Sequence, residues 1–183
     1  MLTPALRKQD AWAFEFIPFN MNIPPLAHDY EYASRLPAAA VEQMLAADLH
    51  HANGTLRLRQ VHAHAHHHAR RVALLRVRHG ITTTLFAIDK YCGYGDCQHF
   101  HDFDVLEGGP PTLRAGDALE FRCTYDNHDH YYLGYGLSAM QEMCGPILIY
   151  TPHDSTQPTV RTWYTSSGVV RTGTGSAWVH SSM

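Results

Sequence analysis

Short β-type segments, separated by turn residues, run through most of this sequence and leave room for one clear helix. Segments such as ITTTLFAIDKY (81–91) and GPILIYTP (145–152) are rich in β-branched and aromatic residues, which favours strands. Clusters such as GGPP (108–111) interrupt them. The 183 residues suffice for one domain with a buried core, so the pattern predicts an all-β antiparallel sandwich or barrel.

The one strong helix candidate spans residues 36–54. Pro37 suits a first helical turn, apolar residues recur at helical spacing, and Asn53-Gly54 ends the pattern. Residues 14–26 alternate apolar positions but contain three prolines, so we expect an edge strand there.

The domain is expected to span residues 15–152, after a lead-in of residues 1–14. Residues 153–183 are rich in Ser, Thr and Gly. They predict a loosely packed extension with one or two strands, around Trp163 and around Val169-Val170.

Charge and cysteine content narrow the function class and the compartment. The net charge is −3 and no long basic block occurs, so neither nucleic acid nor an anionic membrane is an expected partner. No apolar run approaches the roughly 20 residues of a membrane span, and no secretory signal is visible. Four cysteines fit two disulfides in an oxidising or secreted setting, and they also fit free thiols.

Histidine is the unusual residue: there are 15, against 14 Lys and Arg together. In a strand, residues two apart share a face at a spacing of about 6.6 Å. The segment QVHAHAHHHARRV (60–72) would therefore place four histidines on one face and His67 on the other, the four being His62, His64, His66 and His68. Two of them could converge on one metal ion, although spacing does not select the pair, and a histidine-bearing polar face without metal is the alternative.

A methionine in a second segment, residues 116–152, suggests which metal. Buried methionines in β proteins usually fill the core. The Met143 thioether is also a soft ligand that favours Cu(I), whereas zinc rarely takes methionine. Two imidazoles and one thioether would together make a copper ligand set.

Three segments in order carry a family resemblance: HAHHHARRV (64–72), GDALEFRCTY (116–125) and YGLSAMQEMC (135–144). With IPP (23–25) and HDFD (101–104), they resemble the C-terminal domain of the copper type II, ascorbate-dependent monooxygenases. The resemblance implies a jelly-roll β-sandwich with one copper per chain, into which the helix expected at residues 36–54 would be inserted. It implies His64, His66 and Met143 as ligands, with His62 as the fallback.

The same resemblance pairs Cys123 with Cys144 in a disulfide. Cys92 and Cys97 have no clear counterpart in the family; two intervening glycines would let a small disulfide close, and a zinc site is the alternative. His128 and His130 lie in a predicted hairpin loop that could overhang the copper, although we expect exposure or hydrogen bonding there. We expect the same for His99 and His101.

The resemblance implies an enzyme that uses O₂ and ascorbate to hydroxylate an aliphatic C–H bond of a small-molecule substrate. Family members hold a second copper through three histidines in an N-terminal domain. Only residues 1–14 precede the matching region, so we expect a fragment of a longer chain or a separate electron donor. The alternatives are a non-catalytic copper-binding protein for storage, delivery or sensing, and a metal-free interaction module.

The resemblance does not support a peptidyl-glycine substrate. The relative that acts on peptidyl-glycine has an arginine where His62 stands and a tyrosine where Ile147 stands.

Overall fold

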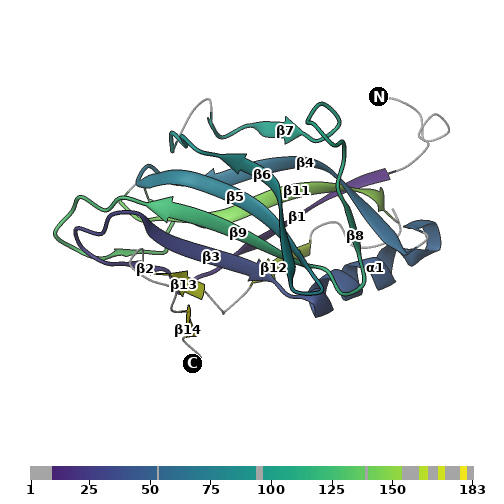
Figure 1. Ribbon diagram of the computed structural model, residues 1–183, viewed down its shortest axis with the longest axis horizontal. Helices are drawn as coiled ribbons and strands as arrows, with labels where there is room; N and C mark the ends of the chain where they lie inside the picture. The colour runs from purple at the N-terminus through teal and green to yellow at the C-terminus, as the bar shows by residue number, and fades with distance from the viewer. Residues whose placement is uncertain are drawn as a thin grey trace.

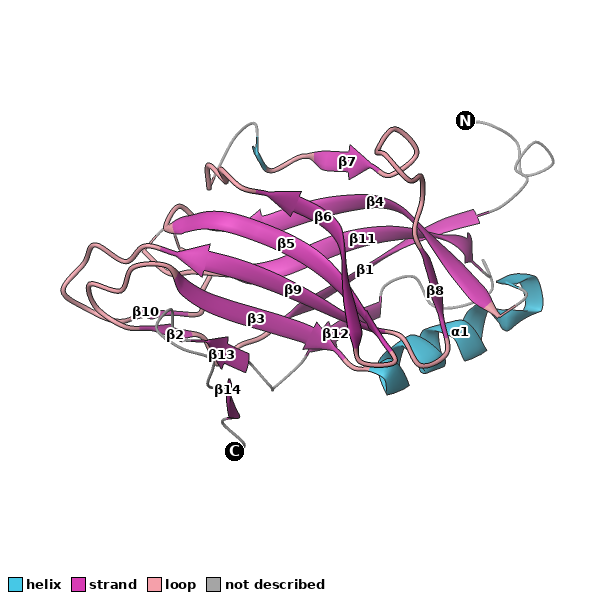
Figure 2. Ribbon diagram, viewed as in Figure 1, coloured by secondary structure: helices cyan, strands magenta, loops and turns pink. Residues whose placement is uncertain are grey.

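The computed structural model describes residues 10–52, 54–93, 97–138, 140–153, 161–164, 169–171 and 178–180. Within them, the chain forms two large open sheets, a two-stranded pair and one helix (Figures 1 and 2). The predicted all-β class is confirmed. Neither large sheet closes into a barrel in the described part of the chain, and the jelly-roll order stays a prediction.

The first large sheet, called the histidine sheet below, contains the histidine-rich strand. Its strands are β12 (Arg161–Tyr164), β1 (Asp10–Ile17), β11 (Cys144–His153), β4 (Thr55–Ala65) and β7 (Phe100–Asp102) in that order, and β8 (Thr112–Arg114) also pairs with β4.

The second large sheet, called the β9 sheet, covers the inner face of the first. Its order is β14 (Trp178–His180), β13 (Val169–Arg171), β3 (Tyr30–Leu36), β9 (Ala118–Tyr125), β5 (Ala69–Arg78) and β6 (Ile81–Ile88). The two-stranded pair is β2 (Asn22–Ile23) with β10 (Leu133–Gly134).

One hydrophobic core lies between the two large sheets. Strand alternation supplies it: on β4, Val61, Ala63 and Ala65 are fully buried, and on β9, Phe121 and Tyr125 are fully buried. His62 and His64, which alternate with these core residues on β4, therefore face outward. This alternation fixes which histidines are available on the outer face.

Helix α1 (Ala38–Ala52) confirms the helix prediction. It starts directly after Pro37 and buries Val41, Met44 and Leu45 against the core. At 15 residues it is too short to cross a bilayer, and no helix in the described residues is long and apolar enough to do so.

The expectation of an edge strand near the N-terminus is wrong. Strand β1 pairs with β11 on one side and, in parallel, with β12 on the other. Its prolines do not interrupt this ladder, because Pro18 follows the last residue of β1 and the Pro24-Pro25 pair follows β2.

The predicted strands around Trp163 and Val169-Val170 are present as β12 and β13, and β14 was not predicted. β13 pairs antiparallel with β3 and with β14, so the extension adds β12 to the histidine sheet and both β13 and β14 to the β9 sheet. The prediction that the extension packs loosely concerns side chains that lie outside the described part of the structure.

Both predicted disulfides form. Cys123 on β9 joins Cys144 at the start of β11, with a Cα–Cα distance of 6.0 Å, and so ties the two sheets together. Cys92 joins Cys97 within one loop, with a Cα–Cα distance of 5.7 Å. The zinc alternative for this second pair is therefore not supported. Disulfides of this kind are typical of proteins from oxidising compartments.

Removing the disulfide between the sheets should be the more destabilising change. The loop-entropy relation gives a loss of about 3 kcal/mol for Cys123→Ala/Cys144→Ala and about 2 kcal/mol for Cys92→Ala/Cys97→Ala. Urea unfolding of both double variants would measure the difference. A larger loss of unfolding free energy in the Cys92/Cys97 variant would contradict the view that the Cys123–Cys144 disulfide is the more stabilising of the two.

Candidate metal centre

The outer face of β4 presents two of the predicted histidines side by side. His62 and His64 alternate with the core residues, their rings are stacked at a centroid distance of 6.1 Å, and both side chains are partly exposed. His66 follows directly after β4, is 5 % exposed, and has its ring 5.4 Å from that of His64. The end of β4 thus gathers three imidazoles.

The prediction that His67 points away from His68 is wrong. β4 ends at Ala65 and β5 begins at Ala69, so residues 66–68 form a turn in which strand alternation stops. The rings of His67 and His68 lie 3.9 Å apart. Ligand atoms of His67, His68 and Glu142 all lie within 4.8 Å of one another, which makes a second, smaller cluster of metal-binding groups.

Met143 contacts His64, one of the three imidazoles at the end of β4. Its Sδ lies 3.3 Å from Nε2 of His64, and its side chain is 6 % exposed. An imidazole nitrogen sits about 2.0 Å and a sulfur about 2.3 Å from a first-row metal ion, so two ligands of one ion lie about 3–4 Å apart. The separation of these two donor atoms fits that requirement.

The orientation of His66 suits the same site. Its Nδ1 lies 2.6 Å from the carbonyl oxygen of Gln141, so Nδ1–H donates and Nε2 is the nitrogen that would bind a metal. The imidazoles of His64 and His66 and the thioether of Met143 are therefore a donor set that fits copper.

The GDALEFRCTY segment (116–125) fixes the Met143 backbone.

 The buried hydroxyl of Tyr125, at the end of that segment, donates to the carbonyl of Met143 at 2.6 Å. The Cys123–Cys144 disulfide holds the next residue along the chain. These two links anchor the methionine to β9, in the opposite sheet.

Gly145 lets β1 lie close to this point. A Cβ on Gly145 would come within 2.5 Å of Cγ1 of Ile17 and 2.6 Å of the carbonyl oxygen of Phe16. A side chain at this position would therefore push β11 away from β1 and disturb the start of β11.

The loop closed by Cys92–Cys97 braces the histidine turn from the other side. The Tyr91 hydroxyl bonds both the N–H and the carbonyl of Ala65 at 3.1 Å, and a Cβ on Gly93 would lie 2.5 Å from the His67 Cα. Gln98 donates to the Ala65 carbonyl at 2.8 Å and makes a side-chain hydrogen bond with His64. This loop therefore orients the His64 ring as well as the end of β4.

Burial favours the neutral form of His64 and of His62. The pKa of His64 is lowered to about 4, mainly by desolvation and also by the neighbouring rings of His66 and His62, against an opposing hydrogen bond from Gln98. Desolvation also lowers the pKa of His62. A neutral imidazole is the form that binds a metal.

The remaining predicted histidines lie elsewhere. His99 and His101 have rings 4.1 Å apart, and His101 also packs against Phe86 at 4.7 Å. His128 is exposed, beside Arg70 and the ring of His28, and His130 is exposed in the same loop. The structure thus gives neither His128 nor His130 a contact with the ligand set.

That loop instead contributes Asp129, whose carboxylate lies 3.3 Å from Nε2 of His68. Sequence reasoning missed this residue, and it also missed Gln98, Tyr91 and Glu142 as neighbours of the histidines. Glu142 alone had a signal, because it stands next to Met143 in the quoted motif.

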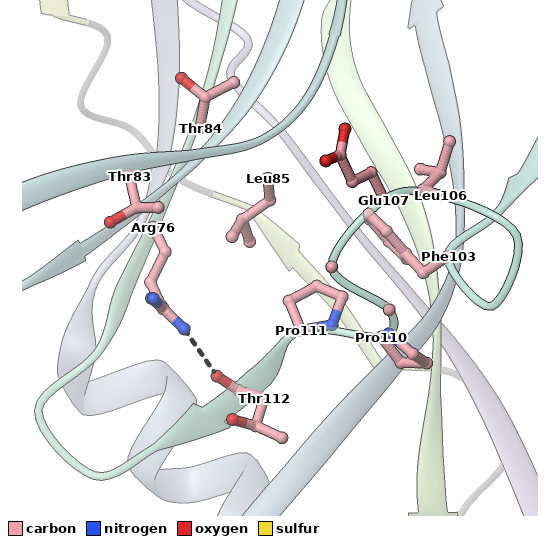
Figure 3. Close-up of a pocket in the computed structure, with 12 residues that line it drawn as sticks. Arg76, Thr83, Thr84, Leu85, Phe103, Leu106, Glu107, Pro110, Pro111 and Thr112 are labelled. Atoms are coloured by element: carbon pink, nitrogen blue, oxygen red, sulfur yellow. Dashed lines mark hydrogen bonds between the residues drawn. The ribbon is translucent and has the colours of Figure 1, made fainter.

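A pocket of about 390 Å³ is lined by none of the residues of the candidate metal centre (Figure 3). It opens between β6 and the loop around Gly108-Gly109, and Arg76 at its side donates to the carbonyl of Thr112 at 3.2 Å. Its lining includes no histidine, so it is separate from the candidate metal centre.

In the metal-free protein, His64 should titrate near pH 4. The unfolded chain binds this proton near pH 6.5 and the folded chain only near pH 4. Folding stability is therefore lost as the pH falls through that interval, and this residue adds no pH dependence above it. NMR titration of the His64 ring measures the midpoint, and a value near 6.5 would contradict the buried geometry.

Comparison with known proteins places the chain in a family. No curated protein matches the chain. Residues 15–165 match the family described as copper type II ascorbate-dependent monooxygenase, C-terminal domain. The match covers most of the 183 residues and includes His64, His66 and Met143. The chain therefore belongs to the copper type II ascorbate-dependent monooxygenase family, as a C-terminal domain.

Proposed function

We propose that this domain binds one copper ion through His64, His66 and Met143 and serves as the oxygen-activating domain of a monooxygenase. The observation that carries the proposal is the 3.3 Å separation between His64 Nε2 and Met143 Sδ. His64 lies on β4 and Met143 directly precedes β11, so the two donors meet only in the folded protein. The thioether favours Cu(I) over zinc.

Copper bound here would activate O₂ for hydroxylation of an aliphatic C–H bond, with ascorbate as the reductant. The chain's own contribution is binding and orientation. Burial keeps His64 neutral, and the Gln141 carbonyl fixes the ring of His66 through Nδ1. His62 remains the fallback ligand, because its ring stacks on His64.

The surface beside His64 supports a substrate other than a peptide carboxylate. His62 pairs across the histidine sheet with Ile147 on β11 and with Phe100 on β7, and Ile147 pairs in turn with Glu15 on β1. Directly paired residues share a face of the sheet. This row presents an imidazole, an isoleucine, an aromatic ring and a carboxylate, and it offers no arginine to bind a substrate carboxylate.

The reducing electrons would come from outside the described residues. Family resemblance suggests either a second copper, held by three histidines in another domain, or a separate donor protein. Two disulfides suit an oxidising or secreted location for such an enzyme.

Replacing the thioether should remove sulfur from the copper environment. X-ray absorption of the Cu(I)-loaded protein should show two imidazoles and one sulfur, and Met143→Ala should show the imidazoles alone. Met140→Ala is the matched control, because Met140 is 63 % exposed and lies only three residues away. No sulfur in the wild-type spectrum, or an unchanged spectrum in Met143→Ala, would refute the ligand set.

Activity requires a second measurement. Copper-loaded protein supplied with ascorbate, a reducing partner and a small molecule with an aliphatic C–H bond should consume O₂ and yield the hydroxylated form of that molecule. Copper binding without such turnover would favour a storage, delivery or sensing role.

A further inference from the structure

The Glu142 side chain is buried beside the candidate copper site and carries no role in the proposed ligand set. It is fully buried, directly precedes Met143, and faces the histidine turn of residues 66–68. A buried carboxylate is costly unless donors surround it, so its partners indicate what it does.

Those partners all come from the histidine turn. Oε2 of Glu142 accepts the backbone N–H of His66 at 3.0 Å. Oε1 accepts the backbone N–H of His68 at 3.0 Å and lies 2.8 Å from Nδ1 of His68. One carboxylate therefore takes three hydrogen bonds from a turn that includes the candidate ligand His66.

The backbone of Glu142 is also held by hydrogen bonds, to a segment other than the histidine turn. Its N–H donates to the carbonyl of Gly134 at 2.9 Å, and its own carbonyl accepts the N–H of Gly136 at 3.2 Å. The side chain thus connects two fixed pieces of backbone, and neither end can shift without losing hydrogen bonds.

Three consecutive residues then meet the histidine segment. The Gln141 carbonyl faces His66 Nδ1, the Glu142 carboxylate binds the turn, and the Met143 sulfur lies at His64 Nε2. Of these contacts, the Glu142 carboxylate supplies the most hydrogen bonds between the two segments.

We propose that Glu142 is a positioning residue that holds the thioether of Met143 against the two imidazoles and so sets the preference of the site for Cu(I). This inference rests on the proposed function. Imidazoles bind both oxidation states of copper, whereas a thioether selectively stabilises Cu(I). Misplacing Met143 should therefore weaken Cu(I) binding far more than Cu(II) binding.

A metal ion at His67, His68 and Glu142 is the competing role for this carboxylate. The hydrogen bonds argue against it, because Oε1 already accepts the backbone N–H of His68 and the Nδ1–H of its ring, so that ring nitrogen carries a proton. Metal stoichiometry in the variant below separates the two roles.

The decisive variant is Glu142→Gln. Glutamine has almost the same size, but its amide nitrogen cannot accept an N–H and must abandon the bond to His66 or those to His68. Glu120→Gln is the matched control: Glu120 is also fully buried, but it pairs with Arg35 at 2.6 Å on the β9 sheet.

The measurements are copper stoichiometry, Cu(I) and Cu(II) affinities by ligand competition, and X-ray absorption of the Cu(I) form. Glu142→Gln should bind Cu(I) about 10- to 100-fold more weakly, as is typical when a residue that orients metal ligands is lost. It should lose the sulfur signal and largely keep its Cu(II) affinity, while Glu120→Gln behaves as wild type.

Three outcomes would overturn the inference: a wild-type Cu(I) affinity and sulfur signal in Glu142→Gln, equal loss of Cu(I) and Cu(II), or loss of a second copper equivalent. Absence of sulfur in the wild-type spectrum would instead refute the copper site, and this inference with it.

If Glu142→Gln does not fold, His68→Leu carries the test. This variant removes one of the three hydrogen bonds and leaves the carboxylate in place. It should weaken Cu(I) binding selectively, and by a smaller factor than expected for Glu142→Gln. An unchanged Cu(I) affinity in His68→Leu would overturn the inference.

Discussion

The antiparallel pairing of β4 with β11 is the constraint on which the rest of the candidate site depends. Its register sets Gly145 opposite His64 and Cys144 opposite Ala65. Met143, which precedes Cys144, therefore lies at the end of β4, where the strand stops before His66. The donor atoms come from positions far apart in the chain, and this register is what brings the thioether to the imidazoles. A slip of one residue would turn the histidines toward the core.

The opposite sheet keeps that register in place. Cys123 and Tyr125, two residues apart on β9, hold Cys144 and the carbonyl of Met143. Asp117, which opens the same segment, is buried and accepts two hydrogen bonds from Arg78, so the turn before β9 is fixed as well. The GDALEFRCTY segment thus contributes anchoring to the candidate metal centre and no ligand of its own.

Much of the fold could be predicted because local patterns agreed with the final structure. The α1 segment had its proline start and apolar spacing, and β9 had alternating core residues. β1 was mistaken for an edge strand because the three prolines of residues 14–26 indicated one, whereas these prolines lie outside β1, which pairs with β12 as well as β11. A local pattern cannot show which distant strand will pair alongside it.

The candidate site, too, could be predicted where a local pattern decides the structure and not where distant segments meet. Alternation correctly placed His62 and His64 on the outer face, and it failed at His67 because the strand ends two residues earlier, at Ala65. The contacts of Gln98, Tyr91 and Asp129 depend on loops whose paths the sequence does not specify. Glu142 was visible in a motif, but its three hydrogen bonds to the turn were not, because they require the two segments to be side by side.

The most direct test of the account is the position of copper in the protein. Anomalous diffraction at the copper edge, from crystals of the Cu(I)-loaded protein, should show one peak within bonding distance of His64 Nε2, His66 Nε2 and Met143 Sδ. A peak among His67, His68 and Glu142 instead, or no ordered copper at all, would contradict it.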